Sequence, residues 1–107
     1  MQSLIAVYKL WHETLPNLPK TQRYTIGSKI DTCFIQTIEA TVTASTLTKQ
    51  EKLPHLERAA SRLDLLKFFL YLAWEIKALD TKKYVLLSEK LDEIGRQLGG
   101  WKKQLQK

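Results

Sequence analysis

Apolar side chains recur at intervals of three and four residues along most of the chain, which is the spacing of one face of an α-helix. No stretch shows the strict alternation that is typical of a β-strand. Breaks in the spacing divide the chain into four predicted helices, at about residues 3–15, 20–46, 50–79 and 81–106. Pro16 and Pro19 separate the first two helices, because proline lacks the N–H group that a helix interior needs.

Polar residues mark the starts of the last two helices. Thr48 and Glu51 have the spacing of a capping box, in which each side chain bonds a backbone N–H of the first turn. Pro54 conflicts mildly with this start, so the boundary is placed at about Gln50. Asp80 is a suitable N-cap for the fourth helix, because its carboxylate can accept from the free N–H groups there.

The apolar spacing of the fourth helix continues past Gly95, Gly99 and Gly100. We therefore expect the helix to run through these glycines, which would allow close approach of a neighbouring helix. A break at Gly99 and Gly100 is the alternative, since glycine is a strong helix terminator.

Four helices joined by short connections predict an all-α fold, an antiparallel up-down-up-down four-helix bundle. The chain has 107 residues, which suits one domain over residues 1–107 and one hydrophobic core. The third helix is apolar on more than one side, and the second carries further apolar residues outside its stripe. We expect an oligomer interface at these surplus positions: Ile35, Val42, Leu65, Phe68, Leu72 and Trp74. A wider core that hides them is the alternative.

The 17 Lys and Arg residues outnumber the 11 Asp and Glu residues and give a net charge of +6, which favours an anionic partner such as RNA or DNA. The cations concentrate at the start of the second helix and at the end of the fourth, and we expect these ends to lie on neighbouring surfaces. The candidate contacts are Lys20, Arg23, Lys29, Arg96, Lys102, Lys103 and Lys107. A surface that serves solubility alone is the alternative.

Residue types that carry catalysis or bind metals are sparse. His12 and His55 have no further histidine or cysteine at metal-ligand spacing, and Cys33 is predicted to be a buried apolar residue. No glycine-rich phosphate loop, targeting signal or membrane-spanning segment is evident. We therefore expect no catalytic activity, cofactor, metal or small-molecule substrate, no membrane partner, and a cytoplasmic location.

Three sequence segments resemble one family. They are Y-K-L-W-H at residues 8–12, L-P-K-T-Q-R-Y-T-I-G-S-K-I at 18–30, and E-I-G-R-Q-L-G-G-W at 93–101. They are similar to the accessory variability determinant (Avd) of diversity-generating retroelements. Avd lies within a wider group of four-helix bundles that includes proteins encoded in intervening sequences of 23S ribosomal RNA. The resemblance covers nearly the whole chain, and the segments at residues 18–30 and 93–101 favour the retroelement branch.

The resemblance implies a small basic bundle that assembles into a homopentameric ring and binds the element's reverse transcriptase and template RNA or cDNA. It implies no catalysis, but support for the error-prone cDNA synthesis that diversifies a target gene. Lys67 matches a basic position of the family's third helix, whereas Tyr71 stands where a second basic residue is found. The other branch implies a nucleic-acid-binding or purely structural, protein-interaction module.

Overall fold

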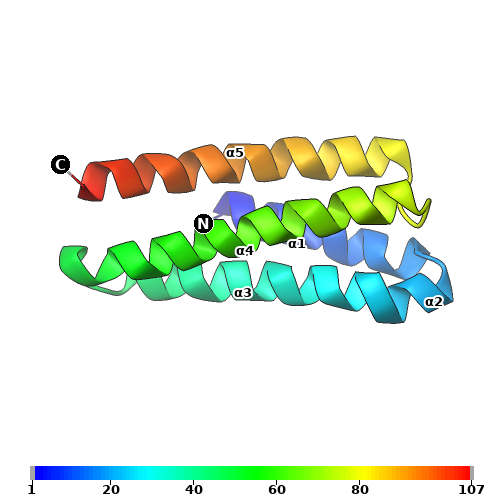
Figure 1. The fold of residues 1–107 in the computed structure, drawn as a ribbon, viewed down its shortest axis with the longest axis horizontal. Helices are drawn as coiled ribbons and strands as arrows, with labels where there is room; N and C mark the ends of the chain where they lie inside the picture. Colours follow the sequence, from blue (N-terminus) through cyan, green and yellow to red (C-terminus); the bar gives the residue numbers. More distant parts are fainter. Residues whose placement is uncertain (1, 107) are drawn as a thin grey trace.

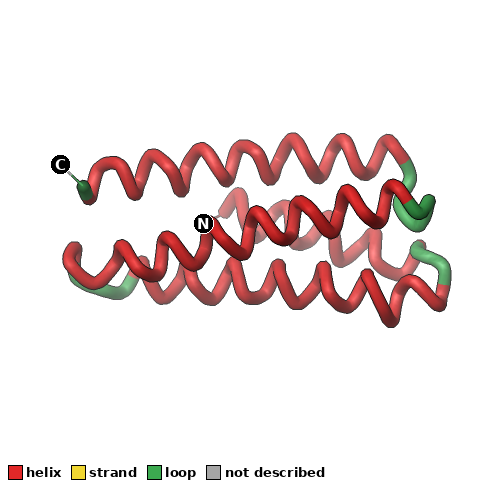
Figure 2. Tube along the Cα trace, in the orientation of Figure 1, coloured by secondary structure: helices red, strands yellow, loops and turns green. Residues whose placement is uncertain are grey.

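Four antiparallel helical rods make up the fold in the computed structural model, which describes residues 2–106 (Figure 1). The rods are joined by short loops, and no strand occurs within this range (Figure 2). The α-helices are α1 (Gln2–Thr14), α2 (Lys20–Gln22), α3 (Ser28–Ser45), α4 (Lys49–Glu75) and α5 (Thr81–Leu105). A π-helical turn, Arg23–Gly27, joins α2 to α3 in one continuous rod. The predicted all-α up-down-up-down bundle is confirmed.

The neighbours of each rod follow from which helices pack together. α3 packs against α4, α4 against α5, and α1 against both α5 and α3. Across the described residues, α1 has no backbone contact with α4, nor α3 with α5, so each of these pairs lies on a diagonal of the bundle. α1 is about half as long as α4 and starts near the middle of the molecule (Figure 1).

The core consists of the predicted apolar stripes. Trp11 of α1 and Phe34 of α3 are fully buried, and their rings stack with centroids 6.1 Å apart. Cys33 is also fully buried, as the sequence predicts. Two buried threonines of α3 would leave polar groups in this core, but Thr37 donates to the Cys33 carbonyl (2.7 Å) and Thr41 to the Thr37 carbonyl (2.8 Å). These bonds allow a helix rich in β-branched residues to cross the interior.

The predicted helix starts are confirmed to within a residue. α4 begins at Lys49, where the Glu51 carboxylate accepts from the Thr48 N–H (3.4 Å), as in a capping box. Pro54 is accommodated inside the second turn of α4. At the next start, an Asp80 carboxylate oxygen accepts from the Lys83 N–H (2.8 Å).

The predicted end of the third helix is wrong, because α4 stops at Glu75 instead of residue 79. Lys77 adopts a left-handed conformation with φ 63°, and the N–H groups of Lys77 and Ala78 bond back to the carbonyls of Trp74 and Ala73. This is the hydrogen-bond pattern of a Schellman motif, which usually has glycine at the left-handed position. A lysine there gives no sequence signal for a helix end.

α5 continues through its glycines to Leu105, as predicted, without a break at Gly99 and Gly100. The expected close approach applies only to Gly95, where an added Cβ would lie 3.5 Å from a Leu63 methyl group. An added Cβ at Gly99 or Gly100 would have nothing within 4 Å, so the predicted packing role of these two glycines is wrong.

Candidate functional site

The two predicted basic clusters lie at opposite ends of the bundle, so the expectation of neighbouring surfaces is wrong. Lys20 and Arg23 lie at the end of the bundle where α1 finishes, whereas Lys102 and Lys103, in the last turn of α5, lie at the end where α3 finishes (Figure 1). The molecule measures 45 Å along this axis. The separation follows from the topology, since the second and fourth rods of an up-down bundle start at the same end and finish together at the other. Lys107 lies outside the described residues.

Arg23 has a structural role that the sequence did not reveal. Its guanidinium donates to the backbone carbonyls of Pro16 (2.9 Å) and Leu18 (3.2 Å), and so fixes the connection between α1 and α2. Its Nε atom is buried without a partner. These contacts use the planar donor fork that would otherwise bind a phosphate.

Two further candidate cations are paired with carboxylates. Lys67 of α4 bonds Asp92 of α5 at 2.8 Å, and Arg96 bonds Glu93 at 2.7 Å within α5. The hydrogen bond to Glu93 raises the pKa of Arg96. Both pairs are exposed and contribute little to stability, but they partly neutralise cations that were expected to face a polyanion. Glu93 lies three residues before Arg96, a spacing that the sequence itself shows, whereas Asp92 could not be matched to Lys67 before the helices were placed.

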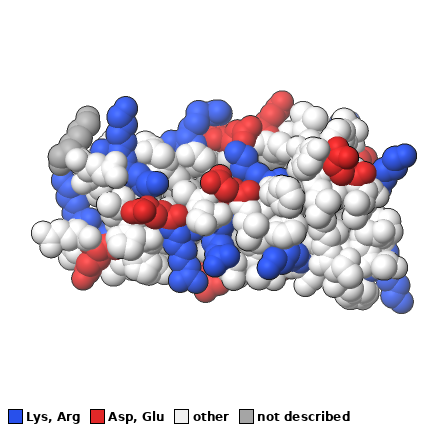
Figure 3. Space-filling view, viewed as in Figure 1, with Lys and Arg blue, Asp and Glu red and all other residues white. Residues whose placement is uncertain are grey.

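The sequence reasoning missed a row of basic groups between α3 and α4. His55, Arg58 and Arg62 follow one another on α4 at intervals of three and four residues, so they share the face turned toward α3. Lys29 of α3 completes the row, with its ammonium 5.9 Å from the ring centroid of Phe69. We call these four residues the α3–α4 seam. Figure 3 shows Lys and Arg side chains gathered along the lower middle of the molecule, over α3 and α4.

Contacts on both helices place the members of the seam together. Burial raises the pKa of the Cys33 thiol, and the charges of Lys29 and Arg62 act in the opposite direction, so both cations lie near this residue. His55 and Arg58 line a polar niche of ≈ 140 Å³ with α3 side chains that include Gln36 and Thr43. Glu39 also lines this niche. A periodicity search for cations on the flank of α4 would have found the row, but not its α3 partners.

Exposed apolar side chains form one surface along α1 and α3. Asp31 accepts a hydrogen bond from Tyr8 of α1, so the face of α3 that carries Asp31 is turned toward α1. Ile35, Ile38 and Val42 follow Asp31 at intervals of four, three and four residues on that face. Ile35 is 40% exposed and Val42 44% exposed. With Ile5 and Tyr8 of α1, these residues make the α1–α3 apolar surface.

A second apolar surface follows the outer side of α4. Phe68 is 55% exposed and contacts Phe69 edge-on. Tyr71 is exposed beside it, whereas Leu65 and Leu72 are half-buried. We call Leu65, Phe68, Tyr71 and Leu72 the α4 apolar surface. Since α1 and α4 lie on a diagonal, the two apolar surfaces lie on different sides of the bundle.

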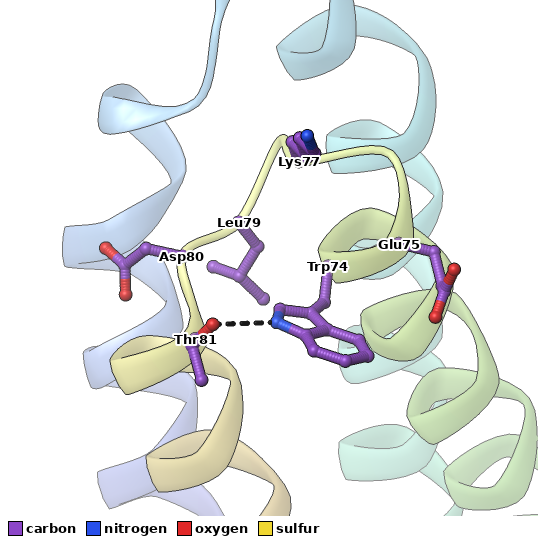
Figure 4. A pocket seen from close by; sticks show the side chains of 6 residues that line it. All are labelled: Trp74, Glu75, Lys77, Leu79, Asp80 and Thr81. Carbon is purple, nitrogen blue, oxygen red and sulfur yellow. Dashed lines mark hydrogen bonds between the residues drawn. The ribbon is translucent and has the colours of Figure 1, made fainter.

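The remaining predicted interface residue, Trp74, lies at the turn between α4 and α5. Its indole stacks on the ring of Tyr84 with centroids 5.1 Å apart and donates to the Thr81 hydroxyl (3.0 Å). Figure 4 shows Trp74 and Thr81 joined by this bond beside the loop that carries Leu79; these residues line an open depression of ≈ 450 Å³. Trp74 is half-buried by contacts within its own chain, which distinguishes it from the exposed Phe68.

Neither a metal-ligand group nor a membrane-spanning helix is found among the described residues. No group of three or more His, Cys, Asp or Glu side chains within residues 2–106 is arranged to hold a metal ion. None of the helices in that range is both long and apolar enough to cross a membrane.

Comparison with protein families finds a match to a family described as bAvd-like, and the match spans residues 2–105. The chain belongs to the bAvd-like family. Searches among curated proteins and among solved structures found no match. Members of Avd-like families are accessory proteins and are generally non-catalytic.

Family membership gives a context for two residues of this bAvd-like chain. Lys67, which was expected to match a basic position of the family, pairs with Asp92 of α5. Tyr71, the expected departure from the family pattern, lies beside the rings of Trp74 and Tyr84, with ring centroids 6.0 Å and 6.5 Å apart.

Proposed function

We propose that this chain is a non-catalytic accessory protein of a diversity-generating retroelement. It binds the reverse transcriptase of the element together with template RNA and the cDNA made from it, and thereby supports mutagenic reverse transcription in the cytoplasm. The observation that carries this proposal is the bAvd-like match over residues 2–105. The net charge of +6 agrees with a polyanionic partner.

The first test measures RNA binding by fluorescence anisotropy, using a labelled single-stranded RNA across a salt series. We expect binding that weakens steeply as salt increases, because affinity for phosphates depends on counterion release. A chain that binds no RNA at 50 mM salt would contradict this part of the proposal. Retention of the purified reverse transcriptase on the immobilised chain, with and without RNA, tests the protein partner separately.

The same proposal includes a homo-oligomer, with the homopentameric ring of the family as its form. The two apolar surfaces support it, because different surfaces on different sides of one protomer favour head-to-tail contacts, and such contacts close into a ring at a suitable angle. We propose that the α4 apolar surface of one protomer packs on the α1–α3 apolar surface of the next. Burial of exposed side chains such as Phe68 and Ile35 would drive the contact.

A mixing experiment separates this assembly from a symmetric one. Ile35→Glu and Phe68→Glu each disable one of the two apolar surfaces, so each variant alone is expected to be monomeric by light scattering. An equimolar mixture retains one intact pair of surfaces and is expected to form a dimer. Two variants that remain monomeric when mixed would argue against the head-to-tail contact, and wild-type chain that is monomeric at micromolar concentration would refute the oligomer.

A further inference from the structure

Several cations without an ion pair lie in one row where α3 meets α4. The ion pairs within residues 2–106 involve Lys67 and Arg96, and neither Arg58 nor Arg62 pairs with a carboxylate. Arg23 is bonded to backbone carbonyls. The seam therefore holds two guanidinium groups whose donors are not committed to other protein groups in this part of the chain.

The niche at one end of the seam has the chemistry of a phosphate site. Arg58 supplies a planar fork of N–H donors, which matches the oxygens of a phosphate. The Gln36 amide, the Thr43 hydroxyl and the His55 imidazole line the same niche and can each donate a hydrogen bond. Its volume of ≈ 140 Å³ corresponds to roughly four to five water molecules and accommodates a phosphate group. Glu39 on the rim would oppose an anion there, so the niche alone is not a strong anion site.

The cations beyond the niche extend the site along the helices. From His55 to Phe69, beneath the ammonium of Lys29, the seam follows α4 for 14 residue steps, or ~21 Å at 1.5 Å per residue. This length corresponds to about six stacked nucleotides at 3.4 Å each. Lys29, Arg58 and Arg62 contribute three positive charges against the one negative charge of Glu39. An elongated row of cations fits a repeating polyanion better than it fits a single small anion.

We propose that the α3–α4 seam binds the sugar-phosphate backbone of single-stranded RNA, with Arg58 and Arg62 as its principal phosphate contacts. The proposal rests on the RNA-binding function proposed above and assigns it to a surface other than the basic ends of the bundle. The seam recognises the charge and spacing of the phosphates and not the identity of the bases, because its side chains donate to phosphate oxygens. The α1–α3 apolar surface lies on another face of α3, whereas Leu65 of the α4 apolar surface lies between Arg62 and Phe69 in the row of the seam.

The test compares two double variants that lose the same charge. Arg58→Gln/Arg62→Gln removes two cations from the seam, and Lys9→Gln/Lys90→Gln removes two exposed cations from α1 and α5. The probe is a labelled 20-nucleotide single-stranded RNA in 0.05–0.3 M salt. Each lost contact with single-stranded RNA lowers the slope of log K against log salt by about 0.7, so the seam variant should lose about 1.4 in slope and about 25-fold in affinity at 0.1 M salt. The control variant should change the slope little.

Further arms separate the ways in which the inference can fail. Arg58→Lys/Arg62→Lys keeps both charges and should retain most of the salt dependence, and circular dichroism should show that all variants are folded. Equal losses in the seam variant and in the Lys9/Lys90 control would overturn the seam while leaving RNA binding intact. A seam variant that keeps its RNA affinity but no longer retains the reverse transcriptase would overturn it in favour of a protein surface. Wild-type chain that binds no RNA would overturn the proposed RNA-binding function itself, and the seam with it.

Discussion

Asp31 joins α1 to α3, and its removal should weaken the bundle more than its partly exposed position suggests. One carboxylate oxygen accepts from the Tyr8 hydroxyl (2.9 Å) and from the Trp11 indole N–H (3.2 Å). Trp11 is 0% exposed, so its N–H cannot turn to bulk water when the acceptor is lost. Asp31→Ala therefore leaves a buried donor without a partner. It also removes the two hydrogen bonds that hold α1 against α3 at the start of the α1–α3 apolar surface.

The expected magnitude follows from these two bonds. Hydrogen bonds to a charged acceptor contribute about 1.5–3 kcal/mol each, and an unsatisfied buried donor costs about 1–3 kcal/mol. Because Asp31 is half-buried and the Tyr8 hydroxyl can regain water, we take the lower part of the combined range. We expect Asp31→Ala to lower the free energy of unfolding by ~2–4 kcal/mol, and Tm by on the order of 10–20 °C for a chain of this size.

Urea unfolding followed by circular dichroism and tryptophan fluorescence measures this loss. The matched control is Asp64→Ala on α4, which removes an exposed carboxylate that has no ion pair within residues 2–106. All variants should be compared at one protein concentration, because assembly would add to the apparent stability. A loss below ~1 kcal/mol, or one equal to that of Asp64→Ala, would refute the reasoning that these two bonds fasten α1.

Three further predictions concern single positions. Burial and the bond to Asp31 raise the pKa of Tyr8 above 10.0. The contribution of Tyr8 to stability is therefore complete below pH 10 and is lost as pH rises through the raised pKa. Tyr8→Phe should remove this loss of stability at alkaline pH, as measured by melting at a series of pH values. Lys77→Gly should raise the free energy of unfolding by ~1 kcal/mol in urea titration, because it relieves the left-handed backbone at φ 63°. Gly27→Ala should lower the free energy of unfolding by ~1–3 kcal/mol, since the added Cβ would lie 2.8 Å from Leu15. Gly99→Ala, where the added Cβ has nothing within 4 Å, should raise it by up to ~1 kcal/mol. Similar shifts in Tm for the two variants would contradict the observed packing.

Patterns local to one helix were sufficient to predict most of the fold. The capping box at Thr48 and the N-cap at Asp80 act within a single turn, so their residue types and spacing located two helix starts. The end of α4 was missed because Lys77 takes a conformation that the sequence signals only when glycine is present. The π-helical turn before α3 also has no local signal, since it accompanies the close packing of Leu15 on Gly27.

Less of the candidate site could be predicted, because a functional charge depends on its neighbours across helices. Lys67 was a candidate contact, but Asp92 of α5 pairs with it in the folded chain. Arg23 was another, but its guanidinium bonds the backbone of the α1–α2 connection. In the sequence, Arg58 and Arg62 are two cations outside the clusters at the helix ends. Their significance arises only when the register of α3 against α4 adds Lys29 and a polar niche to the same row.

Reconstituted cDNA synthesis tests the central claim most directly. The assay combines the reverse transcriptase encoded in the same element with its template RNA, with or without this chain, and measures the yield of template-primed cDNA. We predict that cDNA synthesis depends on the chain and falls with the Arg58→Gln/Arg62→Gln variant. A reverse transcriptase that makes the same cDNA in the same amount without the chain would contradict the proposed accessory function.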